Sequence, residues 1–306
     1  MLDTETVRSA VRTAVELGFQ QVAFSGGEPL LHPDIGSMAA HAKSLGLRVV
    51  LTTNGTLTAR STWKDVAPHL DLVAVSIDGQ PETHNRMRNS DTAFARMREG
   101  LERIGGDGVP FGLIHTLTSA SLPELAWLAS FAMQVDAQLL QLHPLGRVGA
   151  ASSLDTLALD GEGLAKARIV VLQLQICCSV PIHLDVFNRE SVSEDPGLIY
   201  AWPDEGVPGE REVDAPPNPL VVTAEGMVHP VCHEMPPACS LGSLHEADLG
   251  SLYSRWAAAG GRAAFHAHCT RTWARVGPQL HWPYFNWYEE LERAASPRGS
   301  LPVLVD

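Results

Sequence analysis

Short apolar runs alternate with longer amphipathic segments through the first half of the chain. The apolar runs predict strands, while the segments between them repeat apolar residues at helical spacing, as Val7, Val11 and Ala14 do. This alternation is typical of a parallel sheet with helices outside it, so the sequence predicts an α/β fold. Strands are expected at residues 22–24, 48–53, 72–77, 111–117 and 137–143, with a further strand at 182–186, and helices near 35–45, 60–70, 91–104 and 122–134.

Small polar residues follow four of the predicted strands. Ligand sites in parallel α/β proteins collect at the carboxyl ends of strands, because the loops there meet at one edge of the sheet. We therefore expect these four strand ends to form one site. They are Gly26-Gly27-Glu28-Pro29, Thr53-Asn54-Gly55, Ser76-Ile77-Asp78-Gly79 and Leu142-His143-Pro144.

The first strand end has the chemistry for a ligand with a free ammonium group. Paired glycines let a small polar ligand approach main-chain N–H groups closely. Glu28 supplies a negative charge, and Pro29 biases that residue towards an extended backbone. Each strand end also has a simpler interpretation as an ordinary turn, since Asn-Gly and Asp-Gly are common turn dipeptides. Their occurrence at successive strand ends favours a site.

The order and spacing of these strand ends over residues 1–150 resemble the radical S-adenosylmethionine (radical SAM) superfamily. The resemblance implies a partial barrel of six βα units that binds S-adenosylmethionine. His143 is expected either to face the substrate or to be a buried, hydrogen-bonded histidine. The resemblance implies that Gly26, Gly27, Glu28 and Pro29 bind the methionine end of the ligand. It implies that Asn54, Ser76 and Asp78 bind the ribose end, and that the backbone at Leu142 lies beside the adenine. Arg88 would bind the ligand carboxylate, or alternatively would be a solvated loop arginine.

The family's first strand and the loop after it are missing from this sequence. That loop carries three cysteines spaced C-x3-C-x2-C, which hold a [4Fe–4S] cluster, and a cluster needs about four ligands. Only two or three residues precede the first predicted helix, too few for a strand. The predicted fold is therefore α/β, a partial (β/α)6 TIM-like barrel missing its first strand, with a small α+β C-terminal extension. Three explanations are open: a start codon assigned too late, a truncated chain, or a genuine cluster-free relative.

The C-terminal part carries a second resemblance. Residues 220–232 predict a hairpin, and a helix is expected near 249–258. This pattern resembles the SPASM or twitch extension of peptide-modifying radical SAM enzymes, in which a hairpin cysteine binds an auxiliary iron–sulfur cluster. The resemblance makes Cys232 the first ligand, and only Cys239 and Cys269 follow it. The alternatives are a zinc site made from these cysteines with His233, His266 and His268, or an extension without metal.

Three segments are expected along the chain. Residues 1–150 would form the radical SAM partial barrel, 151–218 a connecting helix, strand and linker, and 219–306 the SPASM-like or twitch-like extension. A loop of small residues is expected to leave the barrel at 145–160. The stretch 191–219 is rich in proline, glycine and acidic residues, which predicts a long surface loop.

Composition narrows the class of protein. The 306 residues are 45% hydrophobic and carry a net charge of −13 with no basic run, which argues against binding nucleic acid. No apolar run reaches the roughly 18 residues that span a bilayer, and no signal pattern opens the chain. Five cysteines form an odd set, which favours free thiols or metal ligands over disulfides. We expect a cytoplasmic protein that binds neither nucleic acid nor membrane.

The leading hypothesis is a radical SAM enzyme, truncated and inactive as written because its cluster loop is missing. In that family a [4Fe–4S] cluster cleaves S-adenosylmethionine reductively, and the resulting 5′-deoxyadenosyl radical abstracts hydrogen from the substrate. The C-terminal resemblance implies a peptide or protein substrate, with a small molecule as alternative, and an electron donor such as flavodoxin or ferredoxin. The rival hypothesis is a non-catalytic protein that binds S-adenosylmethionine or a partner on the same scaffold. A third hypothesis is an unrelated barrel enzyme such as an aldolase, which would need a lysine on an inner strand. The sequence disfavours it, because Lys43, Lys64 and Lys166 fall on predicted helices.

Overall fold

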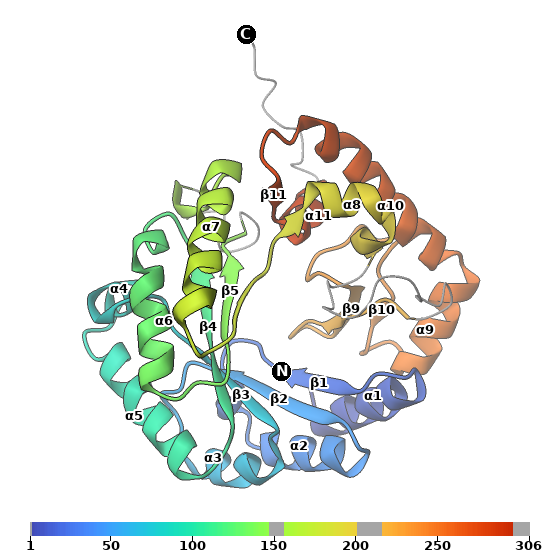
Figure 1. The fold of residues 1–306 in the computed structure, drawn as a ribbon. Coiled ribbons are helices and arrows are strands. Elements are labelled where there is room, and N and C mark those ends of the chain that lie inside the picture. The colour runs from blue at the N-terminus through green and yellow to red at the C-terminus, as the bar shows by residue number, and fades with distance from the viewer. Residues whose placement is uncertain (1, 147–155, 201–215, 296–306) are drawn as a thin grey trace. The chain divides into compact units, whose positions relative to one another are not determined.

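A computed structural model describes residues 2–146, 156–200 and 216–295 of the chain (Figure 1). Most of the loop predicted at 145–160, and about half of the one predicted at 191–219, lie outside these residues.

The described residues form two compact units. The first unit contains residues 3–145 and 157–185, and the second contains most of the remainder, from residue 186 onward. Residues 157–185, which were expected in a connecting segment, therefore pack with the first unit. The domain boundaries at 150 and 218 remain predictions.

The first unit is built around a sheet of six parallel strands, whose spatial order follows the sequence. Most of these strands are short runs rich in β-branched and other apolar residues, which suits strands that are buried on at least one face. The five predicted strands are confirmed, and the further strand near residue 182 completes the sheet by pairing with the fifth. The strands are β1 (Gln21–Phe24), β2 (Arg48–Thr53), β3 (Leu72–Ser76), β4 (Phe111–Leu117), β5 (Leu140–Pro144) and β6 (Ile182–Leu184).

Helices connect these strands and lie along one side of the sheet (Figure 1). The first helix is capped by Asp3, whose carboxylate accepts a hydrogen bond of 2.9 Å from the Thr6 amide.

Two of the helical regions differ from prediction. Pro68 interrupts the helix predicted at 60–70, which ends in a 3₁₀ turn, and Pro81 begins a helix that was not predicted. The helices are α1 (Thr4–Glu16), α2 (Ile35–Ser44), α3 (Ser61–Val66), α4 (Pro81–Met87), α5 (Ala93–Gly106), α6 (Leu125–Gln134) and α7 (Gly161–Cys177).

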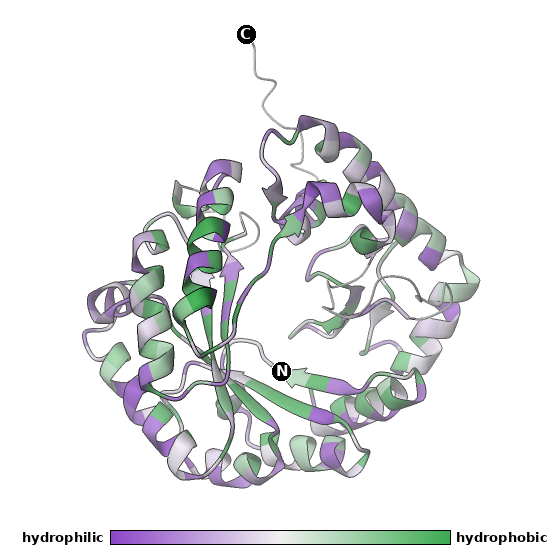
Figure 2. Ribbon diagram, viewed as in Figure 1, coloured by the Kyte–Doolittle hydropathy of each residue, from purple (hydrophilic) through white to green (hydrophobic). Residues whose placement is uncertain are grey.

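The two faces of this sheet differ in polarity. The strands pair in register, so side chains that alternate along one strand line up with those of its neighbours. Residues on the face that meets the helices are apolar and buried, as Val49, Val75 and Leu142 show (Figure 2). We call the opposite, less buried face the open face. Towards the carboxyl ends of the strands the open face carries Thr52, Ser76, Thr116, Gln141 and His143.

Close packing of α5 fixes the turn that follows β2. Gly100 lies on α5 against the main chain of Gly55, and a methyl group built at residue 100 would lie 2.0 Å from the Gly55 carbonyl oxygen. Gly55 itself has a φ of +76°, which disfavours residues with a side chain. Glycine at both positions therefore lets the helix press directly on this turn.

The second unit combines short strands with helices. The hairpin predicted at 220–232 is confirmed, since β8 (Leu220–Val222) pairs antiparallel with β9 (Met227–Pro230). The prediction of a loop from residue 191 is wrong for most of residues 191–200, which belong to a short α-helix and a following 3₁₀ segment. The Asn188 side chain caps the α-helix by accepting hydrogen bonds from two amides of its first turn. The other elements are β7 (Phe187–Asn188), β10 (Gly242–Ser243), β11 (Tyr284–Phe285), α8 (Arg189–Glu194), a 3₁₀ segment (Pro196–Tyr200), α9 (Leu249–Ala258), α10 (Gly261–Val276) and α11 (Trp287–Ala295).

The longest described helix, α7, has 17 residues. Within the described ranges, no helix combines the length and the apolar character needed to cross a membrane.

Candidate functional site

Open space lies beside the two glycines that follow β1. Gly26 has a φ of +115°, a backbone conformation that residues with a Cβ rarely adopt. At both Gly26 and Gly27, a methyl group built in place of a hydrogen meets no described heavy atom within 4 Å. Gly27 has no such φ restraint, so an added methyl group there would fill space without straining the backbone. Main-chain groups at this strand end are therefore open to a ligand.

Glu28 links the end of β1 to the end of β2. Its Oε1 accepts hydrogen bonds from the Thr53 hydroxyl at 2.7 Å and from the Leu30 amide at 3.2 Å. Its Oε2 accepts a hydrogen bond from the Asn54 amide at 2.8 Å. A carboxylate offers about four acceptor positions, and the protein fills three of them here. The two strand ends that were predicted to share a ligand are thus joined directly through this side chain.

Asn54 shapes the turn after β2. Its Oδ1 accepts hydrogen bonds from the Thr56 amide at 2.8 Å and from the Thr56 hydroxyl at 2.6 Å. This arrangement is an Asx turn, in which the side chain substitutes for a main-chain acceptor. The simpler interpretation of Asn54-Gly55 as a turn is therefore correct for the Asn54 oxygen, while its amide nitrogen still offers two donors to a ligand.

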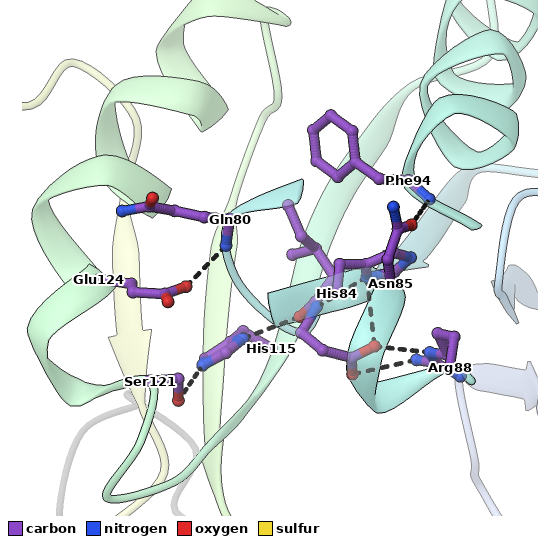
Figure 3. Close-up of polar contacts among 10 residues, drawn as sticks. Gln80, His84, Asn85, Arg88, Phe94, His115, Ser121 and Glu124 are labelled. Carbon is purple, nitrogen blue, oxygen red and sulfur yellow. Dashed lines mark hydrogen bonds and ion pairs between the residues drawn. The ribbon is translucent and has the colours of Figure 1, made fainter. Parts of the chain in front are cut away.

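Asp78 pairs with Arg88 and His84 at the end of β3 (Figure 3). Arg88 donates to the carboxylate from Nε at 2.5 Å and from Nη2 at 3.1 Å, and His84 Nδ1 lies 3.2 Å from Oδ2. Burial acts to raise the pKa of Asp78, but its contacts with His84 and Arg88 outweigh that effect and leave the pKa lowered. His84 Nδ1 accepts a hydrogen bond of 3.1 Å from the main-chain amide of Asp78. Arg88 was predicted to hold a ligand carboxylate, and the structure gives it a protein carboxylate.

Glu124 holds the same loop from the start of α6 (Figure 3). Its Oε2 accepts a hydrogen bond from the Gln80 amide at 2.6 Å, and its Oε1 accepts one from the Thr83 hydroxyl at 2.6 Å. Gly79 has a φ of +140°, and a methyl group built there would lie 2.2 Å from Glu124 Oε2. The loop after β3 is therefore fixed in one conformation by contacts with α4 and α6.

His115 supports the loop from the helix-facing side of β4. The ring is fully buried, with Nδ1 at 2.8 Å from the Ile77 carbonyl and Nε2 at 2.9 Å from the Ser121 hydroxyl (Figure 3). A carbonyl only accepts hydrogen bonds, so Nδ1 carries the proton and Nε2 accepts from Ser121. Burial lowers the pKa of His115 and outweighs the hydrogen bond to Ile77 and the nearby carboxylates of Asp78 and Glu124.

The neutral state of His115 predicts a pH dependence of stability. The unfolded chain takes up a proton at this ring below about pH 6.5, whereas the folded chain takes it up only at a lower pH, so acidification favours unfolding. We expect the free energy of unfolding to fall between pH 7.5 and pH 5.5, and to fall less in His115→Gln. Urea denaturation at steps of pH measures both slopes. The pKa values of His229, His266 and His268 are also lowered by burial, but they contribute equally to both proteins and cancel in the comparison. Parallel slopes would show that His115 already takes up its proton in the folded state.

His143 Nδ1 contacts the Asp185 carboxylate at the carboxyl ends of β5 and β6. The side-chain amide of Gln141 also donates a hydrogen bond from Nε2 to Asp185 Oδ2 at 3.3 Å. The His143 side chain remains 31% exposed on the open face, so it is neither fully buried nor fully solvated. Both predictions for His143 therefore remain predictions, since its ring is partly exposed and also contacts Asp185. Leu142 points into the core, which leaves only its main chain for the ligand.

Sequence reasoning missed four residues that organise this region, namely His115, Ser121, Glu124 and Asp185. Each acts on a strand end that is remote in sequence, as Glu124 does on a loop 44 residues earlier. For Asp185, only the structure shows that it follows the paired ends of β5 and β6 and contacts His143. For the others, no local pattern distinguishes them from ordinary polar residues.

The predicted metal ligands Cys232, Cys239 and Cys269 are buried thiols in the second unit. Burial raises the pKa of all three, and the nearby Glu292 and Cys269 add to this effect at Cys232. A thiol that stays protonated is a poor metal ligand. Among the described residues, no three His, Cys, Asp or Glu side chains are grouped so as to hold a metal ion. The auxiliary cluster and the zinc site therefore remain predictions without a ligand set in the described residues.

A sheet of parallel strands in sequence order, with polar side chains gathered at its carboxyl ends, defines the class as a partial βα barrel. Comparison with protein families agrees, because residues 1–125 match the model of the radical SAM superfamily. Over these residues the chain is similar to that superfamily.

Relatives and solved structures extend this comparison. The chain is 34% identical over 151 residues to an AdoMet-dependent heme synthase of Methanosarcina barkeri, covering 48% of this chain and 43% of that protein. It is 27% identical over 143 residues to a PqqA peptide cyclase of Xanthomonas axonopodis pv. citri, covering 46% and 38%. The chain thus spans less than half the length of these curated relatives.

Two solved structures share the fold. One is anSMEcpe with bound AdoMet and the Kp18Cys peptide, with a TM-score of 0.60 and 18% identity over 88% of this chain and 75% of that one. The other is Streptococcus suis SuiB bound to S-adenosylmethionine, with a TM-score of 0.61 and 16% identity over 82% and 58%. At these identities the likeness shows the fold, a partial βα barrel, and nothing finer.

Proposed function

We propose that this chain binds S-adenosylmethionine across the carboxyl ends of β1 to β5, as the cofactor-binding part of a radical SAM enzyme. The observation that carries the proposal is the open space beside Gly26 and Gly27 at a strand end that is joined, through Glu28, to the next one. The methionine end of the ligand would lie against these glycines. Its ribose would lie towards Asn54 and Ser76, and its adenine along the main chain at Leu142.

The groups at these positions fit such a ligand. Ser76 lies on the open face, and its hydroxyl makes no hydrogen bond to another described residue, so it can bond to a ribose hydroxyl. The amide nitrogen of Asn54 provides two donors at the neighbouring strand end. The Leu142 side chain is fully buried, so only its main chain is available to the adenine. A nucleoside-linked amino acid needs this mixture of main-chain and neutral polar groups.

The residues present do not fit a [4Fe–4S] cluster. The described part of the chain offers no grouping of three suitable side chains, and no C-x3-C-x2-C spacing occurs in the sequence. When bound, such a cluster supplies the electron that cleaves S-adenosylmethionine. The role of this chain's own residues is to bind and orient the nucleoside.

The substrate that we propose is a peptide or protein. Peptide-handling proteins occur both among the curated relatives and among the structures that share the fold, in the PqqA peptide cyclase and in anSMEcpe with its bound peptide. The open face, with His143, Asp185 and Gln141 near its carboxyl edge, offers hydrogen-bonding groups for such a chain. A small molecule is the alternative, since a heme synthase is equally among the relatives. As an enzyme, the protein would receive its electron from a donor such as a flavodoxin or ferredoxin.

The second candidate function is a non-catalytic protein that binds S-adenosylmethionine or a partner. The observation that favours it is the lack of a cluster ligand set in the described residues. The two candidates are separated by anaerobic reconstitution, with iron and sulfide, of a chain extended at its N-terminus by the preceding coding sequence, followed by dithionite and S-adenosylmethionine. Formation of 5′-deoxyadenosine supports the enzyme, and binding without any cleavage supports the second candidate.

Binding itself is tested by equilibrium dialysis with radiolabelled S-adenosylmethionine. We expect Ser76→Ala to bind about tenfold more weakly than the unmodified chain, the effect of losing roughly one hydrogen bond. Ser130→Ala is the matched control, because the Ser130 hydroxyl lies on the exposed side of α6 and donates to the Ala126 carbonyl. Equal affinity in Ser76→Ala and the control, or no binding by the unmodified chain, would contradict the proposal.

A further inference from the structure

One side of α7 carries a row of exposed aliphatic side chains. Ile169 is 60% exposed, Leu172 42% and Ile176 80%. Steps of three and four residues place them on the same face of the helix, one above the other. The other large apolar side chains that are exposed in the described residues occur singly, as Leu31 does. Single exposed apolar residues are ordinary on a protein surface, whereas a continuous row of them marks an interaction site.

The opposite side of α7 is already packed within the first unit. Leu164, Ala167 and Val171 are buried, and the helix packs against α6 and β6 (Figure 1). A surface helix normally has one apolar face and one polar face, but α7 is apolar on both (Figure 2). This is the pattern of a helix that is covered on both sides, and the described residues cover only one of them.

The charges of α7 favour a second copy of this chain as the other covering surface. Beyond its first turn α7 has only two charged residues, Lys166 and Arg168. Residues 163–184 contain no aspartate or glutamate, although the whole chain carries a net charge of −13. Two copies of so acidic a protein repel each other least where carboxylates are absent. The exposed row on α7 is therefore a surface at which two copies can approach.

We propose that two copies of this chain associate through α7, with the two helices antiparallel about a two-fold axis near Leu172. Such an interface uses the same surface on both copies. The row suits this symmetry, because Ile169 and Ile176 lie three and four residues from Leu172 on either side of it. Ile169 of each copy then lies opposite the partner's Ile176, and the two Leu172 side chains meet between them.

The direction of pairing follows from the charges at the two ends of the helix. α7 has no basic residue in its last turn, so the partial negative charge at its carboxyl end is not balanced within the helix. Antiparallel pairing brings Arg168 beside the last turn of the partner's α7, where carbonyl groups lack acceptor bonds within the helix. Parallel pairing would instead place the two Arg168 side chains together, and like charges oppose association.

The length of the row sets the expected strength of the dimer. Three side chains from each copy form a small interface, and association must also offset the lost freedom of motion of two proteins. We therefore expect a reversible monomer–dimer equilibrium with a dissociation constant on the order of 10–100 µM. Sedimentation velocity over a concentration series that spans this range measures it. Cys177 is exposed at the end of α7, so a phosphine reductant is included to prevent disulfide-linked dimers.

Replacing one residue of the row tests the face. We expect Ile176→Ser to raise the dissociation constant of the dimer at least about tenfold, because both copies lose an apolar contact. Leu31→Ser is the matched control and should dimerise as the unmodified chain does, since Leu31 is a 53% exposed aliphatic residue outside α7. An unmodified chain that stays monomeric throughout the series, or equal dissociation constants in the two variants, would overturn the proposal.

A charge exchange tests the direction of pairing. Arg168→Glu should weaken the dimer about threefold, because it sets a carboxylate beside the carboxyl end of the partner's α7. Adding Gln175→Arg to that variant should restore association, because the new guanidinium lies near the partner's new carboxylate only when the helices are antiparallel. A loss that the second change does not restore would show that the helices do not pair in this way. None of these measurements involves a ligand, so their outcome is independent of the proposed function.

Discussion

Replacing Gly100 by alanine should destabilise the first unit by about 3 kcal/mol, at the upper end of the usual cost of overpacking a core. The new methyl group would lie 2.0 Å from the Gly55 carbonyl oxygen, a contact that neither α5 nor the turn can tolerate without moving. Because Asn54 and Glu28 are bonded across this turn, we expect binding of S-adenosylmethionine to be lost along with the stability. Urea denaturation and equilibrium dialysis measure the two effects.

Gly106→Ala provides the control for this prediction on the same helix. Gly106 is exposed near the end of α5, and a methyl group built there meets no described heavy atom within 4 Å. Its replacement should leave stability and binding unchanged or slightly raise stability, because alanine favours helix more than glycine does. If Gly100→Ala and Gly106→Ala behave alike, the close contact between α5 and the turn is not present in solution.

Replacing Gly27 by alanine should have the largest effect on binding without an effect on folding. The added methyl group strains nothing and meets no described heavy atom within 4 Å, yet it fills the space proposed for the methionine end of the ligand. We expect affinity for S-adenosylmethionine to fall at least tenfold, or by at least about 1.4 kcal/mol. Affinity for 5′-methylthioadenosine should change little, since that ligand has no amino acid to displace. Equilibrium dialysis with both ligands tests this.

The stability of Gly27→Ala decides how its binding result is interpreted. An unfolding midpoint equal to that of the unmodified chain shows that only the space beside the glycine has changed. Normal affinity for S-adenosylmethionine at an equal midpoint would mean that the ligand does not approach this strand end.

Much of the first unit could be predicted from local patterns. Strands such as 48–53 and 72–77 are apolar runs between turn residues, and the alternation with helices sets their parallel order. The helix α4 was missed because its seven residues are mostly polar, and only Pro81 at its start indicates it. Short polar helices of this kind are stabilised by tertiary contacts, here the bond from Thr83 to Glu124, which no local window contains.

The candidate site was predictable in its location but only partly in its contacts. Residues at successive strand ends do gather, since Glu28 reaches the Asn54 amide across 26 residues of sequence. The pattern could not reveal that the acidic side chains form hydrogen bonds within the protein. Arg88 and Asp78 could each have been expected to bind a ligand, and they bind each other instead. Such pairing depends on side-chain reach in three dimensions, for which spacing along the chain is no guide.

The strand register described above also bears on how this scaffold could acquire new specificities. Side chains at 116, 141 and 143 project from the open face, while their immediate neighbours along the same strands are packed beneath the helices. Single substitutions at these alternating positions can therefore alter what the surface recognises without disturbing the hydrophobic interior. By contrast, the insertion of one residue upstream in either strand would exchange the two sets, burying the polar groups and exposing the apolar ones. Diversification of this face should proceed through point changes, and length variation should be confined to the loops.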